Sequence, residues 1–338
     1  MLAIVCPGQG SQSPGFLTPW LDLPGVRDQL QELSGAAEVD LLRHGTESDA
    51  DTIRDTAVAQ PLIVAASLVA LRALLEGRAP EDVAQVTAGH SVGELAAAAV
   101  AGVLTDVGAV GLVSHRARAM AEAAAAEPTG MSAVVGGEPE AVLAAIEAAG
   151  LHPANVNGGG QVVAAGSIEG LAALAEAPPA RARVIPLQVA GAFHTPYMRP
   201  AHARFAAVAA GWPAADPRLP LLSDADGAPY PAGPDAPFGR AAEVLARLAD
   251  QVVAPVRWDL CQETLLAQGV TGLVELAPAG VLTGLARRTM RGVETVAVSS
   301  PADLEAARDL VARHGTPGGA SATAPDAPAS PTAEEPSA

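Results

Sequence analysis

Short apolar runs recur along this chain and are separated by longer stretches rich in Ala and Leu. Five runs have the length and composition of buried strands: 2–6, 83–89, 219–223, 272–276 and 294–299. Two of the longer stretches, 58–76 and 93–102, have the apolar spacing of helices. Strands that alternate with helices predict βαβ units around a mainly parallel sheet, so we expect an α/β fold.

The pattern differs between residues 129 and 190. Strand-like and helix-like stretches follow one another there in the order βαββαβ: 131–137, 139–150, 154–157, 161–166, 167–177 and 182–189. This order is typical of a ferredoxin-like unit. We therefore expect a ferredoxin-like subdomain at 129–190, inserted into a larger α/β domain that is formed by 1–128 and 191–314.

Composition limits the partners of the protein. The 338 residues carry a formal net charge of −17, and aromatic residues make up 3% of them, so the core must be built from Ala, Val and Leu. The negative charge argues against nucleic-acid binding, which needs clustered cations. All 20 cationic residues are Arg, which excludes mechanisms that need Lys, such as a Schiff base or a P-loop.

Several features predict a cytoplasmic protein. Cys6 and Cys261 lack the spacing of a redox motif and are typical of reduced thiols. The apolar run at 2–6 is too short for a signal peptide, and we expect no membrane span. Residues 315–338 are small, polar or proline, and we expect this Ala/Pro-rich tail to be disordered.

The stretch GHSVGE at 89–94 is the first candidate for chemistry. It places Ser91 between Gly89 and Gly93, where a strand is expected to become a helix. In a nucleophile elbow the serine lies at such a sharp turn, and the glycines let the strand and the helix approach each other. The alternative is an ordinary tight turn with an incidental serine, because the pattern alone has many false positives.

A serine needs a base to become a nucleophile near neutral pH, and histidine is the usual one. His194 lies in the small-residue segment VAGAFHTPYM, which is expected to be a loop after a strand. A structural role for this histidine is the alternative. The glycine-rich loop at 7–15 follows the first strand and can direct main-chain N–H groups at a developing oxyanion, unless it is an ordinary turn.

Five motifs occur in one order: PGQGSQ at 7–12, GHSVGE at 89–94, HRARAMAEA at 115–123, GAFHTPYM at 191–198 and QVVAPVRW at 251–258. Together they resemble the malonyl-CoA:acyl carrier protein transacylases, the family that includes acyltransferase domains of fatty-acid and polyketide synthases. The resemblance covers roughly residues 1–300 and includes the ferredoxin-like unit. It implies that 1–128 and 191–314 form an α/β-hydrolase-like catalytic domain. It implies ping-pong transfer of a malonyl group from malonyl-CoA to the pantetheine thiol of holo acyl carrier protein, through a serine-linked acyl-enzyme.

The resemblance also implies roles for the residues of the reaction centre. Ser91 matches the acyl-carrying nucleophile and His194 matches its base. Gln251 matches the residue whose main-chain carbonyl orients the histidine, which makes the centre a Ser–His dyad without an acid. Gln9 and Val92 match the oxyanion hole, to which they contribute main-chain N–H groups.

Substrate selection is expected from a second set of residues. Arg116 matches the arginine that binds the free carboxylate of malonyl-CoA, and a guanidinium can do so through two parallel hydrogen bonds. Phe193 and Val92 are typical of relatives that select malonyl over methylmalonyl, although one methyl group contributes only ~1–3 kcal/mol of discrimination. Phe193 and His90 are expected to line the acyl pocket, with His90 in a structural hydrogen-bonding role.

A basic cluster is the candidate docking surface for the carrier protein. Arg287, Arg288 and Arg291 lie together in LARRTMRG, and acyl carrier proteins are acidic. The alternative is a solvated helix end whose cations suit the helix dipole. Two residues depart from the family pattern: Ala117 stands where many relatives have Gly, and Asp224 stands where Asn is usual.

Two other classes of function are open at this point. A serine hydrolase would release the acyl group to water, but Asp106 is no clear candidate for its acid and the other candidate aspartates follow His194 in the chain. A noncatalytic docking protein would not need Ser91, His194 and Arg116 together. We expect malonyl-CoA and holo acyl carrier protein as partners, no metal, no bound cofactor, no nucleic acid, no membrane, and a monomer.

Overall fold

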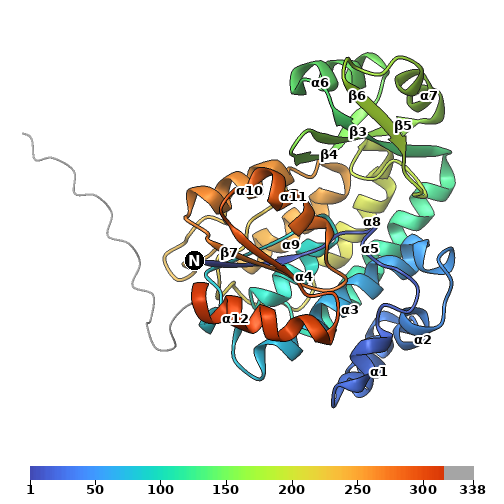
Figure 1. Ribbon diagram of the computed structural model, residues 1–338. Coiled ribbons are helices and arrows are strands. Elements are labelled where there is room, and N and C mark those ends of the chain that lie inside the picture. The colour runs from blue at the N-terminus through green and yellow to red at the C-terminus, as the bar shows by residue number, and fades with distance from the viewer. Residues whose placement is uncertain (316–338) are drawn as a thin grey trace, which may run out of the picture.

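Figure 1 shows the computed structural model, which describes residues 1–315. Its larger domain is built around four parallel strands in the order β2-β1-β7-β8. They are β1 (Leu2–Cys6), β2 (Val86–Gly89), β7 (Gly272–Glu275) and β8 (Glu294–Ala297). The α/β fold with a mainly parallel sheet is therefore confirmed.

Both faces of this sheet are covered, which explains why β1 is apolar at every position. Leu2 and Ile4 lie in one hydrophobic cluster, and Ala3 and Val5 lie in another on the opposite face. The first cluster includes residues of α3 (Thr56–Leu75), α4 (Gly93–Val100) and α12 (Leu304–His314), and the second includes residues of α10 (Trp258–Ala267) and α11 (Val281–Thr289).

The other helices surround this core. They are α1 (Val26–Ala37), α2 (Leu41–Thr46), α5 (Asp106–Ala126), α8 (Arg199–Ala209) and α9 (Ala241–Asp250). Short 3₁₀ turns lie at Thr18–Asp22, Thr52–Arg54, Pro80–Asp82, Pro196–Met198, Gln251–Val253 and Pro301–Asp303. Helix α5 packs against α1, α3 and α8, so it joins the N-terminal and C-terminal halves of the larger domain.

Helix α3 lies inside the larger domain. By length and composition alone it could cross a membrane, but 83% of its most apolar window is buried within the fold. Helices α2, α4, α5 and α12 all pack against it. Its apolar sequence is therefore accounted for by the core, as is usual for a central helix that is hydrophobic all round.

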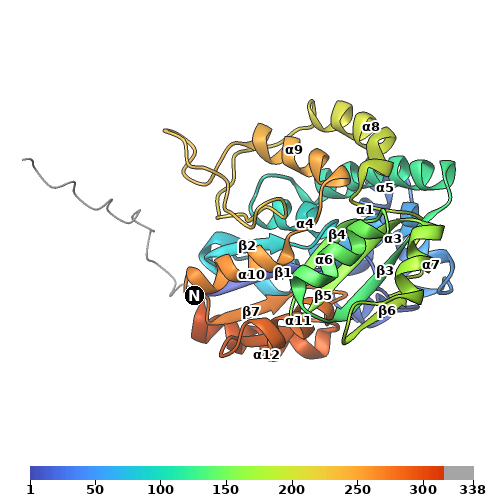
Figure 2. The ribbon, with the colours of Figure 1, turned by 90° about the horizontal axis from the view of Figure 1, so that it is seen from above.

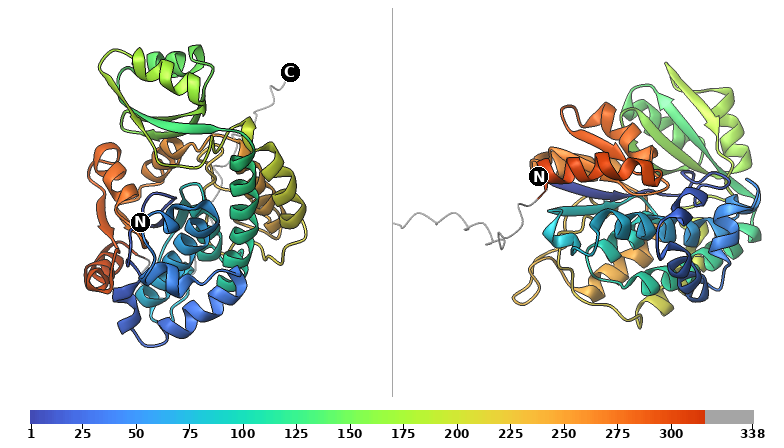
Figure 3. Two further views of the ribbon diagram at one scale, coloured as in Figure 1. Left: turned by 90° about the vertical axis from the view of Figure 1, so that its right-hand side faces the viewer. Right: turned by 60° about the horizontal axis from the view of Figure 1, so that its bottom comes forward.

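The subdomain contains an antiparallel sheet in the order β4-β5-β3-β6. Its elements are β3 (Thr129–Gly136), α6 (Pro139–Ala148), β4 (His152–Gly158), β5 (Gln161–Ser167), α7 (Ile168–Glu176) and β6 (Ala182–Pro186). Figure 3 shows it as a separate layer above the larger domain, and Figure 2 shows the two sheets beside each other from above. The predicted βαββαβ order is present.

Main-chain hydrogen bonds join the subdomain to the larger domain. The N–H of Val156 in β4 donates to the carbonyl of Val256 at 2.8 Å, and the N–H of Val256 donates to Ala154 at 2.9 Å. Val256 belongs to the segment that follows Gln251. The subdomain is thereby fixed relative to a segment that carries a candidate site residue.

The strand predicted at 219–223 is not a regular strand in the structure. Residues 219–223 form isolated bridges, with Leu221 beside Thr87 and Leu222 beside Pro229. Pro220 has no N–H, so the segment adds only a short ladder beside β2 and no regular strand.

Several other predicted strands are shorter than expected; those at 272–276 and 294–299 end at Glu275 and Ala297. The one predicted at 83–89 begins at Val86, because Val83 still closes the preceding 3₁₀ turn. The one predicted at 182–189 ends at Pro186. The predicted tail at 315–338 lies, beyond Gly315, outside the described residues.

Candidate active site

The turn between β2 and α4 presents Ser91 in a left-handed main-chain conformation, with a φ of +54°. This value is uncommon for a residue other than glycine and persists where the surrounding contacts enforce it. A Cβ on Gly89 would overlap the main chain of Gly93, and a Cβ on Gly93 would overlap the carbonyl of Cys6. Strand and helix therefore touch on both sides of the serine, which is the geometry of a nucleophile elbow.

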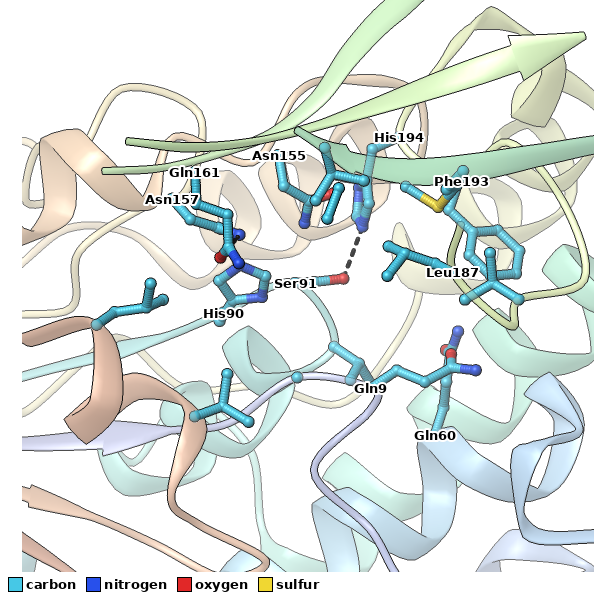
Figure 4. A pocket seen from close by; sticks show the side chains of 18 of the residues that line it. Gln9, Gln60, His90, Ser91, Asn155, Asn157, Gln161, Leu187, Phe193 and His194 are labelled. Atoms are coloured by element: carbon cyan, nitrogen blue, oxygen red, sulfur yellow. Dashed lines mark hydrogen bonds between the residues drawn. The ribbon is translucent and has the colours of Figure 1, made fainter. Parts of the chain in front are cut away.

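Ser91, His194 and Gln251 form one hydrogen-bonded chain. The Oγ of Ser91 lies 2.7 Å from Nε2 of His194, as the dashed line in Figure 4 marks. Nδ1 of the same ring lies 2.8 Å from the main-chain oxygen of Gln251. Because a carbonyl oxygen can only accept, Nδ1 carries the proton and Nε2 presents its lone pair to the serine hydroxyl. A general base requires this arrangement.

The surroundings of His194 keep its ring neutral. The side chain is buried, and burial together with the positive charge of Arg116 lowers its pKa to about 3. Its loop is held by the Thr195 hydroxyl, which donates to the carbonyl of Ala192, and by the N–H of Ala192, which donates to Thr129. His194 is therefore neutral at pH 7, and the lone pair on its Nε2 is free to accept the hydrogen bond of the Ser91 hydroxyl.

The loop after β1 lies against the elbow. A Cβ on Gly8 would be 2.8 Å from both Nδ1 and the carbonyl oxygen of His90, so this loop approaches the residue before Ser91 closely. Within residues 1–315, neither the N–H of Gln9 nor that of Val92 donates a hydrogen bond, and both residues line the same cavity as Ser91. Val92 also caps the N-terminus of α4. These two N–H groups are suited to a negatively charged oxygen.

A cavity of about 220 Å³ lies over Ser91, with lining residues from both domains. Figure 4 shows Gln9 and Gln60 on one side of it and the polar side chains of β4 and β5 on the other. Phe193 and His90, for which the sequence predicts an acyl pocket, line this cavity. Nε2 of His90 lies 2.8 Å from Oδ1 of Asn157, so His90 links the elbow to the subdomain.

Arg116 is fully buried on α5. Its Nη1 and Nη2 donate to the amide oxygens of Gln60 and Gln251, each at 2.7 Å. Burial lowers its pKa to about 10, which leaves the guanidinium charged at neutral pH. Arg116 does not itself line the cavity, whereas Gln60 does. Gln60 therefore connects the cavity to the guanidinium through one hydrogen bond.

Three further polar residues belong to the site. Sequence reasoning missed Gln60 and Glu94, and noted Asp224 only as a departure from a family pattern. All three are buried. Gln60 precedes Pro61 in the apolar α3, and Glu94 lies in the first turn of the Ala-rich α4. A lone polar residue in an apolar helix was the available signal, because such a residue is costly to bury without hydrogen bonds.

The candidate docking arginines lie at the C-terminal end of α11. Arg287, Arg288 and Arg291 are exposed, and no ion pair forms on them within residues 1–315. Val281 and Leu285 of the same helix line the cavity. The basic cluster therefore lies at the end of a helix that lines the cavity over Ser91.

Comparison with known proteins finds close similarity over nearly the whole chain. Residues 3–306 match the family described as acyl transferase domain. The malonyl CoA-acyl carrier protein transacylase of Mycobacterium tuberculosis is 51% identical over 315 residues, which cover 92% of this chain and 100% of that protein. The transacylase of the same name from Escherichia coli is 33% identical over 318 residues, covering 91% and 99%.

Solved structures agree with this similarity. The crystal structure of MCAT from Mycobacterium tuberculosis superposes with a TM-score of 0.85 and 51% identity, covering 92% of this chain and 99% of that chain. A malonyl-transacylase in complex with its type II PKS acyl-carrier protein superposes with a TM-score of 0.80 and 30% identity, covering 91% and 99%. Both comparisons extend over the larger domain and the subdomain.

Proposed function

The chain belongs to the acyl transferase domain family, and from this premise we propose that it moves a malonyl group from malonyl-CoA to the pantetheine thiol of holo acyl carrier protein through an ester on Ser91. The observation that carries this proposal is the chain from Ser91 Oγ through the ring of His194 to the carbonyl of Gln251. It supplies a nucleophile, a neutral base and a fixed tautomer.

In the first half-reaction Ser91 attacks the thioester carbonyl of malonyl-CoA. The hydroxyl proton passes to Nε2 of His194 as the Oγ–C bond forms, and the carbonyl oxygen becomes an oxyanion. The N–H groups of Gln9 and Val92 stabilise that oxyanion. When the C–S bond breaks, the proton leaves His194 for the sulfur, so that coenzyme A departs as a thiol and malonyl-Ser91 remains.

In the second half-reaction the carrier protein's pantetheine thiol enters the same cavity. His194 takes the thiol proton, the sulfur attacks the malonyl ester, and the same two N–H groups hold the second oxyanion. The Oγ–C bond then breaks and the proton returns to Ser91. Atoms balance without a metal or a bound cofactor, and coenzyme A acts only as the carrier of the substrate.

Arg116 accounts for a preference for malonyl over acetyl groups. The free carboxylate replaces the Gln60 oxygen at the guanidinium and forms two charge-assisted hydrogen bonds. An acetyl group brings no such partner, and loss of a charged partner in a closed site costs on the order of 3–5 kcal/mol. Phe193 and Val92 border the acyl pocket, which favours malonyl over methylmalonyl to a smaller extent.

The carrier protein docks on the basic cluster of Arg287, Arg288 and Arg291 in this proposal. A local positive patch is needed because the chain as a whole carries a net charge of −17. The product supplies fatty-acid or polyketide synthesis. In this proposal the enzyme acts as a monomer in the cytoplasm.

Intact-mass measurement tests the proposal. The protein is mixed separately with malonyl-CoA, acetyl-CoA and methylmalonyl-CoA, and its mass is read before and after addition of holo carrier protein. We expect a malonyl adduct that is discharged onto the carrier protein. The adduct should be absent in Ser91→Ala and retained in Ser114→Ala, a matched control whose buried hydroxyl donates to Val110 on α5.

Other outcomes would favour the rival functions. An adduct lost to water at the same rate with and without carrier protein would indicate a hydrolase. Absence of an adduct with every thioester would leave a noncatalytic docking role. A malonyl adduct that persists in Ser91→Ala would place the nucleophile elsewhere.

A further inference from the structure

Two carboxyl groups lie buried directly beside the nucleophile. Glu94 lies in the first turn of α4 and is 2% exposed, and Asp224 lies in the loop after residues 219–223 and is 0% exposed. The N–H of Asp224 donates to Oε1 of Glu94 at 2.8 Å. The Nε2 of Gln251 donates to Oε2 of Glu94 and lies 3.4 Å from Oδ2 of Asp224. One amide group therefore bridges the two acids.

This cluster holds the main chain of Ser91 on both sides. The N–H of Ser91 donates to Oδ2 of Asp224 at 2.6 Å. The carbonyl of Ser91 accepts from Nε2 of Gln251 at 2.8 Å. Since Ser91 has an unfavourable φ of +54°, these two bonds help to keep it in the conformation that directs Oγ at His194.

The charges around the cluster do not allow both acids to ionise at low cost. Arg116 is the buried cation nearest to them, and it contacts them only through the amide of Gln251. Burial raises the pKa of both carboxyl groups, and the charge of Glu94 raises that of Asp224 further. The other titratable groups that face them are Arg247 on α9, Tyr230, Cys261 on α10 and the neutral His194.

Arg247 does not supply a second positive charge for the two acids. It is partly exposed and is already paired with Asp226 and Glu243. Tyr230 and Cys261 are buried, and burial raises the pKa of both, so they stay neutral at pH 7. The buried cluster thus has one effective positive charge, on Arg116, and two acids.

We propose that Glu94 and Asp224 form an acid pair that holds one proton at neutral pH and uses its single negative charge to position Ser91 and to balance Arg116. The inference rests on the proposed acyl-serine mechanism for its kinetic consequence, but its protonation state can be measured without it. Glu94 and Asp224 are positioning residues, since the structure gives them no contact with the reacting atoms.

Loss of that proton has a predictable effect on acylation. A second full charge would then lie in the cluster that holds the main chain of Ser91. It would disfavour the oxyanion that forms on the substrate and would compete with the substrate carboxylate for Arg116. The acylation rate should fall about tenfold or more as the pair becomes doubly charged at alkaline pH. An amide at either position would keep the hydrogen-bond acceptor and remove this ionisation.

The protonation state is tested by isotope-edited infrared spectroscopy of the full chain. We expect the carbonyl stretch of one protonated carboxylic acid at pH 7, which disappears on titration to alkaline pH. It should be lost in Asp224→Asn and in Glu94→Gln, because each remaining acid ionises beside Arg116. Asp226→Asn is the matched control, since it removes an exposed carboxylate from the same loop, and it should retain the band.

A band that survives in either buried-site variant would assign the proton to a single carboxyl and overturn the pair. Absence of the band in the unsubstituted protein would also overturn the pair, and this measurement does not depend on whether the variants fold. In single-turnover acylation by malonyl-CoA, the alkaline fall should vanish in Asp224→Asn and persist in Asp226→Asn. Formation of a malonyl adduct with identical pH profiles in both variants would overturn the pair while leaving the proposed function intact.

Discussion

The Oγ of Ser91 and Nε2 of His194 lie 2.7 Å apart although 103 positions separate them in the chain. Both residues have left-handed main-chain conformations, with φ values of +54° and +60°. Two strained turns, one after β2 and one after the subdomain, are thus directed at each other. Strain at both ends of one hydrogen bond indicates that the fold is organised around this contact.

Substitution of Ser91 or of His194 should slow acylation, and the size of the decrease should differ between the two. Ser91→Ala removes the atom that carries the acyl group, so transfer should fall by about 10³-fold or more. His194→Ala leaves the hydroxyl without a base, and the rate of adduct formation should fall by about 10²–10⁴-fold. Stopped-flow release of coenzyme A measures both. A His194→Ala rate within twofold of the unsubstituted protein would exclude the histidine as base.

The stability of the protein should depend on pH through His194. Its folded pKa of about 3 lies below the ordinary value near 6.5, so between these values the unfolded chain binds a proton that the folded chain does not. The contribution of His194 to the free energy of unfolding should therefore fall by on the order of a few kcal/mol as pH decreases from about 6.5 towards 3, and be constant at higher pH.

Urea unfolding at a series of pH values measures this dependence. His194→Gln should show a shallower decrease between pH 6.5 and pH 4, because it lacks the buried imidazole. His202→Gln is the control, since His202 is partly exposed and bonded to Asp250 on the surface. Equal slopes for His194→Gln and the unsubstituted protein would contradict the neutral, buried state of His194.

Arg116→Lys tests recognition of the substrate carboxylate. An ammonium group keeps the charge but cannot donate to Gln60 and Gln251 in the planar geometry that the guanidinium uses. We expect kcat/KM for malonyl-CoA to fall by about 10²-fold and the preference over acetyl-CoA to decrease with it. Arg118→Lys, two positions along α5 and paired with Glu38, should change neither value. An unchanged malonyl preference in Arg116→Lys would place the carboxylate elsewhere.

Much of the architecture was predictable from local pattern. The buried run of β1 and the βαββαβ order of the subdomain are periodic features that a single sequence displays directly. The segment at 219–223 was wrongly predicted as a strand because it is as apolar as the strands of the sheet. Pro220 limits its pairing to isolated bridges. Apolar content alone does not distinguish a strand from a buried connection.

The site was predictable only where a motif carried it. The small residues around Ser91 and the loop around His194 mark both positions in the sequence. The contacts of Gln60 and Glu94 with Arg116 and Gln251 depend on how distant elements pack, and no spacing in the chain encodes them. Their only local sign is a polar residue in an apolar helix.

Charge reversal at α11 tests the docking surface. Arg288→Glu should raise KM for holo carrier protein roughly three- to tenfold and weaken its salt dependence, because an exposed charge at the rim of an interface acts mainly on association. Arg27→Glu on α1 alters the net charge equally and should have no such effect. If both variants raise KM to the same extent, the net charge and not the basic cluster determines association.

The close contacts of α4 with β2 and with the end of β1 give the last prediction. Gly89→Ala would force a Cβ into the main chain of Gly93, and Gly93→Ala would force one into the carbonyl of Cys6, and no flexible side chain is present to move aside. We expect each to reduce the free energy of unfolding by about 3 kcal/mol or more, since overpacking must displace backbone. Gly35→Ala, in α1 with open space around it, should instead stabilise by about 0.5–1 kcal/mol.

Urea unfolding of the three variants, followed by the intact-mass assay with malonyl-CoA, separates packing from chemistry. Any folded fraction of Gly89→Ala should acylate poorly, because the displaced turn moves Ser91 Oγ away from Nε2 of His194. Gly35→Ala should acylate like the unsubstituted protein. If Gly89→Ala were as stable and as reactive as Gly35→Ala, the glycines would not be required for the elbow, and the left-handed conformation of Ser91 would have to be held by its hydrogen bonds to Asp224 and Gln251 alone.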